Sequence, residues 1–289
     1  MQKKSIKFKN FSPIIKFLKK FNLKSFNSKK NVNKYMRFFE LFQLLEKKKY
    51  DIKKRKVKSH LVTVSPQHKI PFEADLPDLC RLHWIVLSRK IINVLEFGSG
   101  FSTIFMADAQ SILKKYFRRI DGLRYEKQFH TYAIEESKYY SKITQNRSPI
   151  YLKKFYSIII GKAEITTYNN HYVSKFKNLP NISPDLIYLD GPSLYFTKKK
   201  LNGFSFSKIN RVPMAADILY FEYFLEPGTV IVVDGRTANA RFLKDNFKRK
   251  WKYYHDENGD CHYFELNEKP LGKYNIKKLK FCLENIKFI

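Results

Sequence analysis

Apolar and polar residues alternate with two different periods between residues 61 and 268, which predicts a succession of strands and helices. Short β-rich apolar runs predict buried strands over residues 91–95, 131–134, 156–160, 185–189 and 229–233. Apolar residues at helical spacing predict helices over residues 78–90, 102–116 and 215–225. Strands that alternate with helices pair in parallel through right-handed crossovers. The pattern therefore predicts an α/β fold, a doubly wound and mostly parallel sheet that binds ligands at the carboxyl ends of its strands.

The two ends of the chain differ from this region. Residues 252–255 and 262–266 predict an antiparallel hairpin, because Asn258-Gly259 between them suits a type I′ turn. Residues 269–289 predict a basic tail.

Residues 1–60 form a separate, strongly basic extension. Within it, helical spacing of apolar residues predicts helices over residues 14–21 and 35–45. Basic amphipathic helices either pack their apolar face on their own domain or lie on an anionic membrane surface, and both interpretations stay open here.

The net charge of the chain suggests a class of partner, but the overall composition weakens this suggestion. A net charge of +30 favours nucleic acid or an anionic membrane as a partner. Lys, Asn, Ile, Phe and Tyr are abundant throughout, however, which indicates a compositional bias of the whole chain and lowers the weight of the charge. Cys80, Cys261 and Cys282 are widely separated, so neither a disulfide framework nor a zinc site is predicted. With no apolar run long enough to span a bilayer, we expect a cytoplasmic protein, at most peripheral to the membrane.

The first predicted strand leads an acidic residue, Glu96, into a glycine turn that opens a helix. Gly98 and Gly100 permit a tight turn and close approach of a ligand to the backbone. Ser102 or Thr103 could cap the following helix, whose N-terminal amides favour a carboxylate. The dinucleotide pattern G-x-G-x-x-G needs a third glycine where this chain has Thr103, which disfavours a nicotinamide cofactor.

Each later predicted strand also ends beside a candidate residue. Glu135 follows the second strand, Gly161 and Ala163 follow the third, Asp190 follows the fourth, and Asp234 follows the fifth. Because parallel strands present their carboxyl ends at one edge of a sheet, we expect these residues to lie on one rim.

This ordered set, from Glu96 to Asp234, resembles the class I S-adenosylmethionine-dependent methyltransferases, in particular those that methylate hydroxyls of small molecules. The resemblance covers about residues 75–268 and implies a Rossmann-like sheet of seven strands with a terminal antiparallel hairpin. It implies S-adenosylmethionine as cofactor. The cofactor-binding residues implied are Glu96, Gly98, Ser99, Gly100, Ser102, Glu135, Ala163 and Asp190.

The resemblance also implies individual roles. Glu96 holds the amino group of the cofactor, and the alternative is a carboxylate that only braces the loop. Glu135, preferred to Glu136, accepts both ribose hydroxyls, and the alternative is a solvated side chain. Asp190 faces the sulfonium and removes the proton of the acceptor, and the alternative is an aspartate that caps the next turn.

The acceptor side has weaker signals. Ser193, Asp234 and Arg236 are candidate substrate-binding residues. In cation-dependent relatives an aspartate after the fourth strand and an Asp-Asn pair after the fifth hold magnesium. Here Gly235 follows Asp234, so no metal is predicted, and Asp190 with Asp234 is the only combination that could serve.

We therefore predict methyl transfer to a hydroxyl of a small molecule or a saccharide. Nucleic-acid methylation is an alternative that the charge favours, but Asp190-Gly191-Pro192 departs from the Asp-Pro-Pro segment of enzymes that flip a base. A catalytically inactive domain that binds a membrane surface through residues 1–60, or binds a partner, is a third interpretation.

Overall fold

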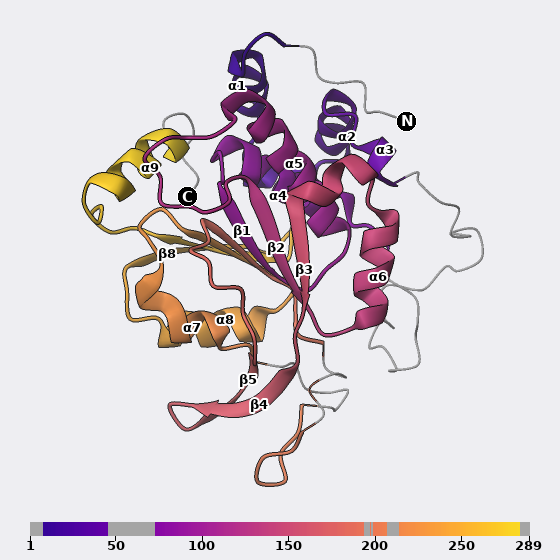
Figure 1. Cartoon of the computed structure of the whole chain (residues 1–289). Helices are drawn as coiled ribbons and strands as arrows, with labels where there is room; N and C mark the ends of the chain where they lie inside the picture. Colours follow the sequence, from indigo (N-terminus) through magenta and orange to yellow (C-terminus); the bar gives the residue numbers. More distant parts are fainter. Residues whose placement is uncertain (1–7, 46–72, 194–196, 198, 207–213, 284–289) are drawn as a thin grey trace, which may run out of the picture.

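A seven-stranded sheet forms the centre of the computed structural model (Figure 1). The structure describes residues 8–45, 73–193, 197, 199–206 and 214–283. The strands of the sheet are β1 (Asn93–Phe97), β2 (His130–Glu135), β3 (Tyr156–Ile160), β6 (Leu186–Leu189), β7 (Val230–Asp234), β8 (Trp251–Asp256) and β9 (Cys261–Leu266). Their order across the sheet is β3-β2-β1-β6-β7-β9-β8. The first five of these pair in parallel, whereas β9 is antiparallel to both β7 and β8. This confirms the predicted doubly wound sheet with its terminal hairpin.

Helices cover both faces of the sheet. They are α1 (Ser12–Leu18), α2 (Lys29–Phe38), α3 (Phe42–Leu45), α4 (Leu76–Ser88), α5 (Phe101–Phe117), α6 (Lys138–Arg147), α7 (Asp217–Phe221), α8 (Thr237–Asn246) and α9 (Lys273–Leu283), with 3-10 turns η1 (Leu23–Asn27), η4 (Ile150–Phe155) and η5 (Glu222–Phe224). Alternate strand residues point to opposite faces, so Val94 packs in the core under α4 and α5 while Leu95 packs in the core under α7 and α8. None of the described helices combines the length and the apolar character that a membrane crossing needs.

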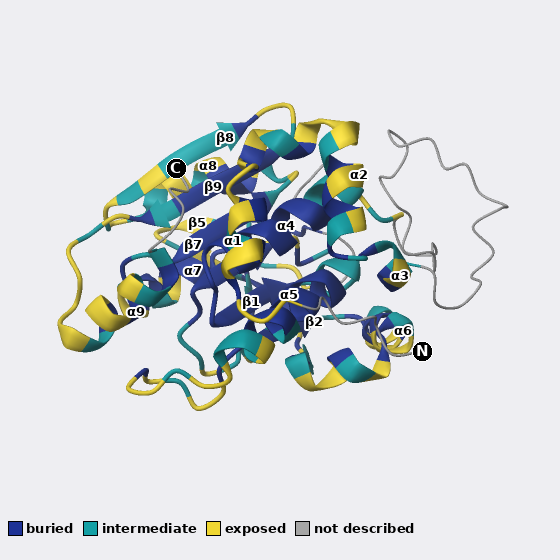
Figure 2. Ribbon diagram, turned by 90° about the horizontal axis from the view of Figure 1, so that it is seen from above, coloured by how far each residue is buried: buried dark blue, intermediate teal, exposed yellow. Residues whose placement is uncertain are grey.

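The basic N-terminal segment packs on the sheet domain. Ile14, Phe26 and Tyr35 are fully buried in the same core as Trp84 of α4. The indole Nε1 of Trp84 donates to the carbonyl of Leu18 at 3.1 Å. As a result α4 lies between the sheet and the N-terminal helices and is buried on almost every side (Figure 2). The apolar faces of α1 and α2 are thus covered by their own protein. The expected boundary at residue 60 lies outside the described residues.

The C-terminal segment also differs from the expected basic tail, because it contains helix α9. Lys278 is buried on this helix, and its Nζ lies 2.9 Å from Oδ1 of Asp185 and 2.6 Å from Oε2 of Glu226. Cys282 is buried as well. The sequence suggested a tail because lysines dominate it, but one of these lysines neutralises two carboxylates at the end of the sheet.

Two turns depart from the sequence prediction. A second, unpredicted hairpin of β4 (Ala163–Tyr168) and β5 (His171–Phe176) projects from the sheet, and its turn residues Asn169 and Asn170 both have positive φ (Figure 1). The expected type I′ turn at Asn258-Gly259 is wrong, since positive φ occurs at Asp260 in a longer loop. Gly259 has a different role: a Cβ there would lie 2.6 Å from the guanidinium of Arg81.

Candidate active site

The glycine turn joins β1 to the N-terminus of α5 at the carboxyl edge of the sheet. Gly98 has φ +113°, which favours glycine, and its amide donates to the carbonyl of Ile134 at 2.8 Å, so the turn is tied to the end of β2. The helix begins at Phe101, one residue earlier than predicted. The hydroxyl of Thr103, rather than that of Ser102, accepts from the amide of Gly100 at 3.1 Å.

Glu96 braces this turn. Its Oε1 accepts from the hydroxyl of Ser102 at 2.5 Å and its Oε2 from that of Thr103 at 2.7 Å. Burial raises the pKa of Glu96 to about 8, although the two hydrogen bonds oppose the shift. The bracing role considered from the sequence is therefore present. Contact of Glu96 with a cofactor stays a prediction, and each carboxylate oxygen keeps a second lone pair for it.

Two consecutive acids end β2 and connect to different loops. Glu135 accepts from the hydroxyl of Ser99 at 2.8 Å and from the amide of Ser137 at 2.9 Å. Glu136 accepts from the amide of Ser193, in the loop after β6, at 3.0 Å. Burial raises the pKa of both, that of Glu136 to about 8 with help from the charge of Glu135. On sequence grounds Glu135 is preferred to Glu136. In the structure the two adjacent side chains point in opposite directions and reach different loops, so both contribute to this edge.

The loop after β6 crosses the end of β1. The amide of Asp190 donates to the carbonyl of Phe97 at 3.1 Å, and a Cβ on Gly191 would lie 3.0 Å from that same carbonyl. A larger residue at position 191 would therefore require this backbone to shift by a few tenths of an ångström. The Gly191–Pro192 bond is cis.

The carboxyl group of Asp190 lies at the same rim as the glycine turn. The protein around the carboxyl group and the negative charge of Asp234 raise its pKa, while Arg236 opposes this, and Asp190 keeps access to solvent. Residues 194–196, 198 and 207–213, in the segment that follows Ser193, lie outside the described residues.

Arg236 holds this loop in place. Its Nη2 donates to the carbonyls of Asp190 at 2.7 Å and Pro192 at 3.1 Å. Its Nη1 is buried and has no hydrogen-bond partner among the described residues. The sequence predicted a substrate-binding arginine, and the structure shows a residue that positions a loop and keeps one nitrogen for a further acceptor.

Asp234 belongs to a buried polar cluster that the sequence did not reveal. Its Oδ2 accepts from the hydroxyl of Tyr188 at 2.5 Å, and the thiol of Cys261 lies 3.5 Å from its Oδ1. Ligand atoms of Asp234, Cys261 and Asp78 lie within 4.8 Å of one another, as in a metal site. Arg81, however, contacts both Asp78 and Cys261 through Nη1, so a guanidinium already provides the positive charge.

A divalent cation would have to share this space with Arg81, so the cluster does not fit a metal. Asp190 is not a member of it. Asn239 does not reach the rim either, because its side chain pairs with the backbone of Ala215 through bonds of 2.9 and 3.1 Å. Ala163 is a buried residue that opens β4 and pairs with Phe176, so its proximity to a cofactor stays a prediction.

Comparison with known proteins adds the following. The sequence matches no protein-family model and no curated protein. A putative O-methyltransferase from Klebsiella pneumoniae has 15% identity and a TM-score of 0.38, with 70% of this chain and 84% of that chain covered. An O-methyltransferase from Bacillus cereus in complex with SAH has 15% identity and a TM-score of 0.37, covering 83% and 92%. An SAH-bound methyltransferase from Podospora anserina has 12% identity and a TM-score of 0.43, covering 92% and 100%.

The order of the strands decides the fold class. Five parallel strands are followed by an antiparallel strand, β9, that inserts between β7 and β8. The fold is that of class I methyltransferases. At the carboxyl edge of this methyltransferase fold, the ends of β2, β1, β6 and β7 lie side by side. The predicted residues found on that rim are Glu96, Gly98, Ser99, Gly100, Ser102, Glu135, Asp190, Ser193, Asp234 and Arg236.

Proposed function

We propose that this protein transfers the methyl group of S-adenosylmethionine to a hydroxyl group of a small molecule or a saccharide. The observation that supports the proposal is the arrangement of β2, β1 and β6 as neighbours. Their ends place Glu135, the Gly98 turn and Asp190 side by side at one edge. A ligand with an adenosine half and an amino-acid half spans such a row of strand ends.

The cofactor needs a site for each of its parts. Helix α5 is long, and its N-terminus opens at the glycine turn, where the amides attract the cofactor carboxylate. Glu96 and Ser99 lie beside this turn, where we expect them to accept hydrogen bonds from the amino group of the cofactor. Glu135 accepts from the hydroxyl of Ser99 and the amide of Ser137 at the end of β2, and we expect its carboxylate to accept the two ribose hydroxyls as well.

The reaction itself needs little from the protein besides position and a base. Methyl transfer is an in-line displacement, so donor and acceptor must be held at the right distance and angle. Asp190 has a raised pKa and access to solvent, which suits a carboxylate that takes a proton from the acceptor hydroxyl. The free Nη1 of Arg236 supports an acceptor that carries an oxygen acceptor group next to its hydroxyl.

Calorimetric titration of the full chain with S-adenosylmethionine and with S-adenosylhomocysteine tests this proposal. We expect both to bind with one site per chain, because the residues above contact parts that the two molecules share. Guanosine, which carries no phosphate, serves as a control for unspecific binding of a nucleoside. Absence of binding at millimolar S-adenosylmethionine would rule out the proposed cofactor and with it the proposed reaction.

A further inference from the structure

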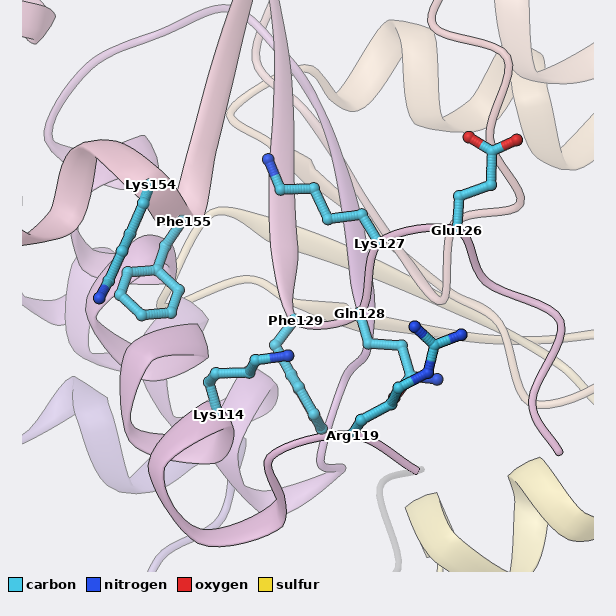
Figure 3. Close-up of a pocket in the computed structure, with 8 residues that line it drawn as sticks. All are labelled: Lys114, Arg119, Glu126, Lys127, Gln128, Phe129, Lys154 and Phe155. Carbon is cyan, nitrogen blue, oxygen red and sulfur yellow. The ribbon is translucent and has the colours of Figure 1, made fainter. Parts of the chain in front are cut away.

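A pocket lies at the opposite, amino edge of the sheet, beside the starts of β2 and β3. Its volume is about 270 Å³, just below the roughly 300–1,000 Å³ of typical small-molecule sites. The last turns of α5, the loop between α5 and β2, and η4 all contribute to it (Figure 3). Because β2 runs from His130 to Glu135, roughly 20 Å of strand separates this pocket from the rim of the candidate active site.

The walls of this pocket carry an excess of positive charge. Lys114, Arg119, Lys127 and Lys154 line it together with one acid, Glu126. In the part of the chain that the structure describes, none of the four cations forms an ion pair with a carboxylate. Cations that share a space without an anion repel one another, so a bound anion would relieve the repulsion.

His130, the neighbour of Lys127, does not neutralise the positive charge of the pocket. The Nζ of Lys127 lies 3.2 Å from Nε2 of His130, which in turn lies 2.8 Å from the hydroxyl of Ser157. Burial and the charge of Lys127 lower the pKa of His130 to about 3, so the imidazole is neutral at physiological pH. Partial burial also lowers the pKa of Lys127. A neutral imidazole supplies no negative charge to this lysine.

The pocket has a fixed shape. The side chain of Gln128 is buried and pairs with both backbone groups of Ile120, at 2.7 and 2.9 Å, which ties the loop across the pocket. Phe129 is buried with φ +63°, a conformation that non-glycine residues adopt only where the surroundings impose it. The half-buried ring of Phe155 forms an apolar part of the wall, whereas the ring of Phe129 is buried, with the Nζ of Lys114 over it.

Lysine abundance alone does not account for this combination. A chain with a net charge of +30 exposes lysines everywhere, and Lys114 also complements the C-terminal end of α5. Lys154 likewise lies in the last turn of η4. Arg119 and Lys127 lie outside the helices, in the loop between α5 and β2, and complement no helix end. All four cations line one hollow, whose loop Gln128 ties to Ile120.

We infer that this amino-edge pocket binds a diphosphate group, either free or carried by an organic molecule that rests on the half-buried ring of Phe155. A diphosphate offers several oxygens to cations that approach from different sides. The inference concerns a site apart from the proposed cofactor site and does not depend on it.

Titration of the full chain with inorganic pyrophosphate and with ADP tests this inference. The double variant Lys127→Gln/Lys154→Gln removes two of the four charges from exposed positions, where folding is unaffected. We expect its affinity for pyrophosphate to fall about tenfold, from the loss of two exposed charge contacts. Lys153→Gln is the matched control, since Lys153 is an exposed neighbour that does not line the pocket. We expect its affinity to equal that of the unmodified chain.

Comparison of pyrophosphate, ADP and S-adenosylhomocysteine distinguishes the possible binding sites. Equal binding of pyrophosphate and ADP supports a site for the diphosphate alone, whereas tighter binding of ADP supports a contribution from the ring of Phe155. Saturation with S-adenosylhomocysteine leaves both affinities unchanged if the ligand sits at the amino edge. No binding of pyrophosphate, an equal loss in Lys153→Gln, or displacement of ADP by S-adenosylhomocysteine would each overturn the inference.

Discussion

The two ends of strand β2 differ in chemistry. At its carboxyl end, Glu135 and Glu136 accept hydrogen bonds from Ser99, Ser137 and Ser193, all of which are neutral donors. Before its amino end, the pocket wall contains four cations and a single acid. The carboxyl end of β2 is thus acidic and connected by hydrogen bonds, while the four cations of the pocket near its amino end form no ion pair within the described residues.

This difference indicates ligands of opposite charge. Neutral donors orient these acids without providing a positive charge, and burial raises their pKa. A ligand with a sulfonium and an amino group would supply that charge and favour the ionised carboxylates, so the carboxyl edge suits such a ligand. Uncancelled cations at the amino edge suit an anion. The exceptions at the carboxyl edge are Arg81, which neutralises the Asp234 cluster, and Arg236, which holds the loop after β6.

The largest expected effect concerns the glycine turn of the acidic edge. Gly98→Val places a branched side chain at φ +113°, on the path by which a ligand approaches the backbone. We expect the affinity for S-adenosylhomocysteine to fall by at least about 100-fold, beyond detection in calorimetry. Unchanged affinity would refute the assignment of this turn to the cofactor.

Backbone strain must be separated from the loss of ligand contact. Gly272→Val is the matched control, because Gly272 also has positive φ (+84°) but lies in the exposed loop before α9. Both variants should lose stability in urea by about 1–3 kcal/mol. Only Gly98→Val should lose the cofactor.

The next effect concerns catalysis at the same edge. Asp190→Asn keeps the shape of the side chain but removes the proton acceptor, so we expect turnover to fall about 100-fold or more. The affinity for S-adenosylhomocysteine should stay within about threefold, because the contacts of Gly98 and Glu135 are intact. Asp245→Asn, on the exposed part of α8, is the control for a lost charge. A turnover equal to that of the control would exclude Asp190 as the base.

The acidic edge could be predicted from sequence because its residues directly follow apolar runs. Glu96, Glu135, Asp190 and Asp234 each lie at the end of a strand, and parallel strands bring such positions together. Their individual roles were less accessible. The bracing of Glu96 depends on the hydroxyls of the first helical turn, which the sequence presented only as possible caps.

The remaining sites could not be predicted, since they join residues from distant parts of the chain. Arg81 and Cys261 are 180 positions apart and meet only because α4 packs over the end of β9. The basic pocket combines Lys114 with Lys154, two lysines in a chain rich in lysine. Local patterns of polarity contain no information on contacts between residues that are distant in the sequence.

A third prediction tests the cation of the acidic edge. The side chain of Arg81 is only 2% exposed, so Arg81→Gln leaves the half-buried Asp78 and Asp234 without their positive partner. We expect the free energy of unfolding to fall by about 3–5 kcal/mol, measured in urea. The double variant Arg81→Gln/Asp78→Asn should recover part of this loss because one of the unpaired carboxylates is removed. A loss below about 1 kcal/mol would contradict the role of Arg81 as the internal counter-charge.

The last effect is a pH dependence of the free energy of unfolding, which we expect from an acid at the carboxyl edge and not from one at the amino edge. An unfolded glutamate loses its proton near pH 4.5, whereas burial keeps Glu96 protonated to about pH 8. Between these values the folded state binds more protons than the unfolded state, so Glu96 lowers stability as the pH rises, by at most about 1.4 kcal/mol per pH unit.

Urea unfolding of Glu96→Gln at several pH values measures this contribution. The variant should become more stable than the unmodified chain as the pH increases from 5 to 8, since glutamine cannot ionise. Glu126→Gln, at the exposed wall of the amino-edge pocket, should show no such trend because its side chain stays in water in both states. A parallel change in both variants would mean that general charge, and not burial of Glu96 behind the glycine turn, governs the pH dependence.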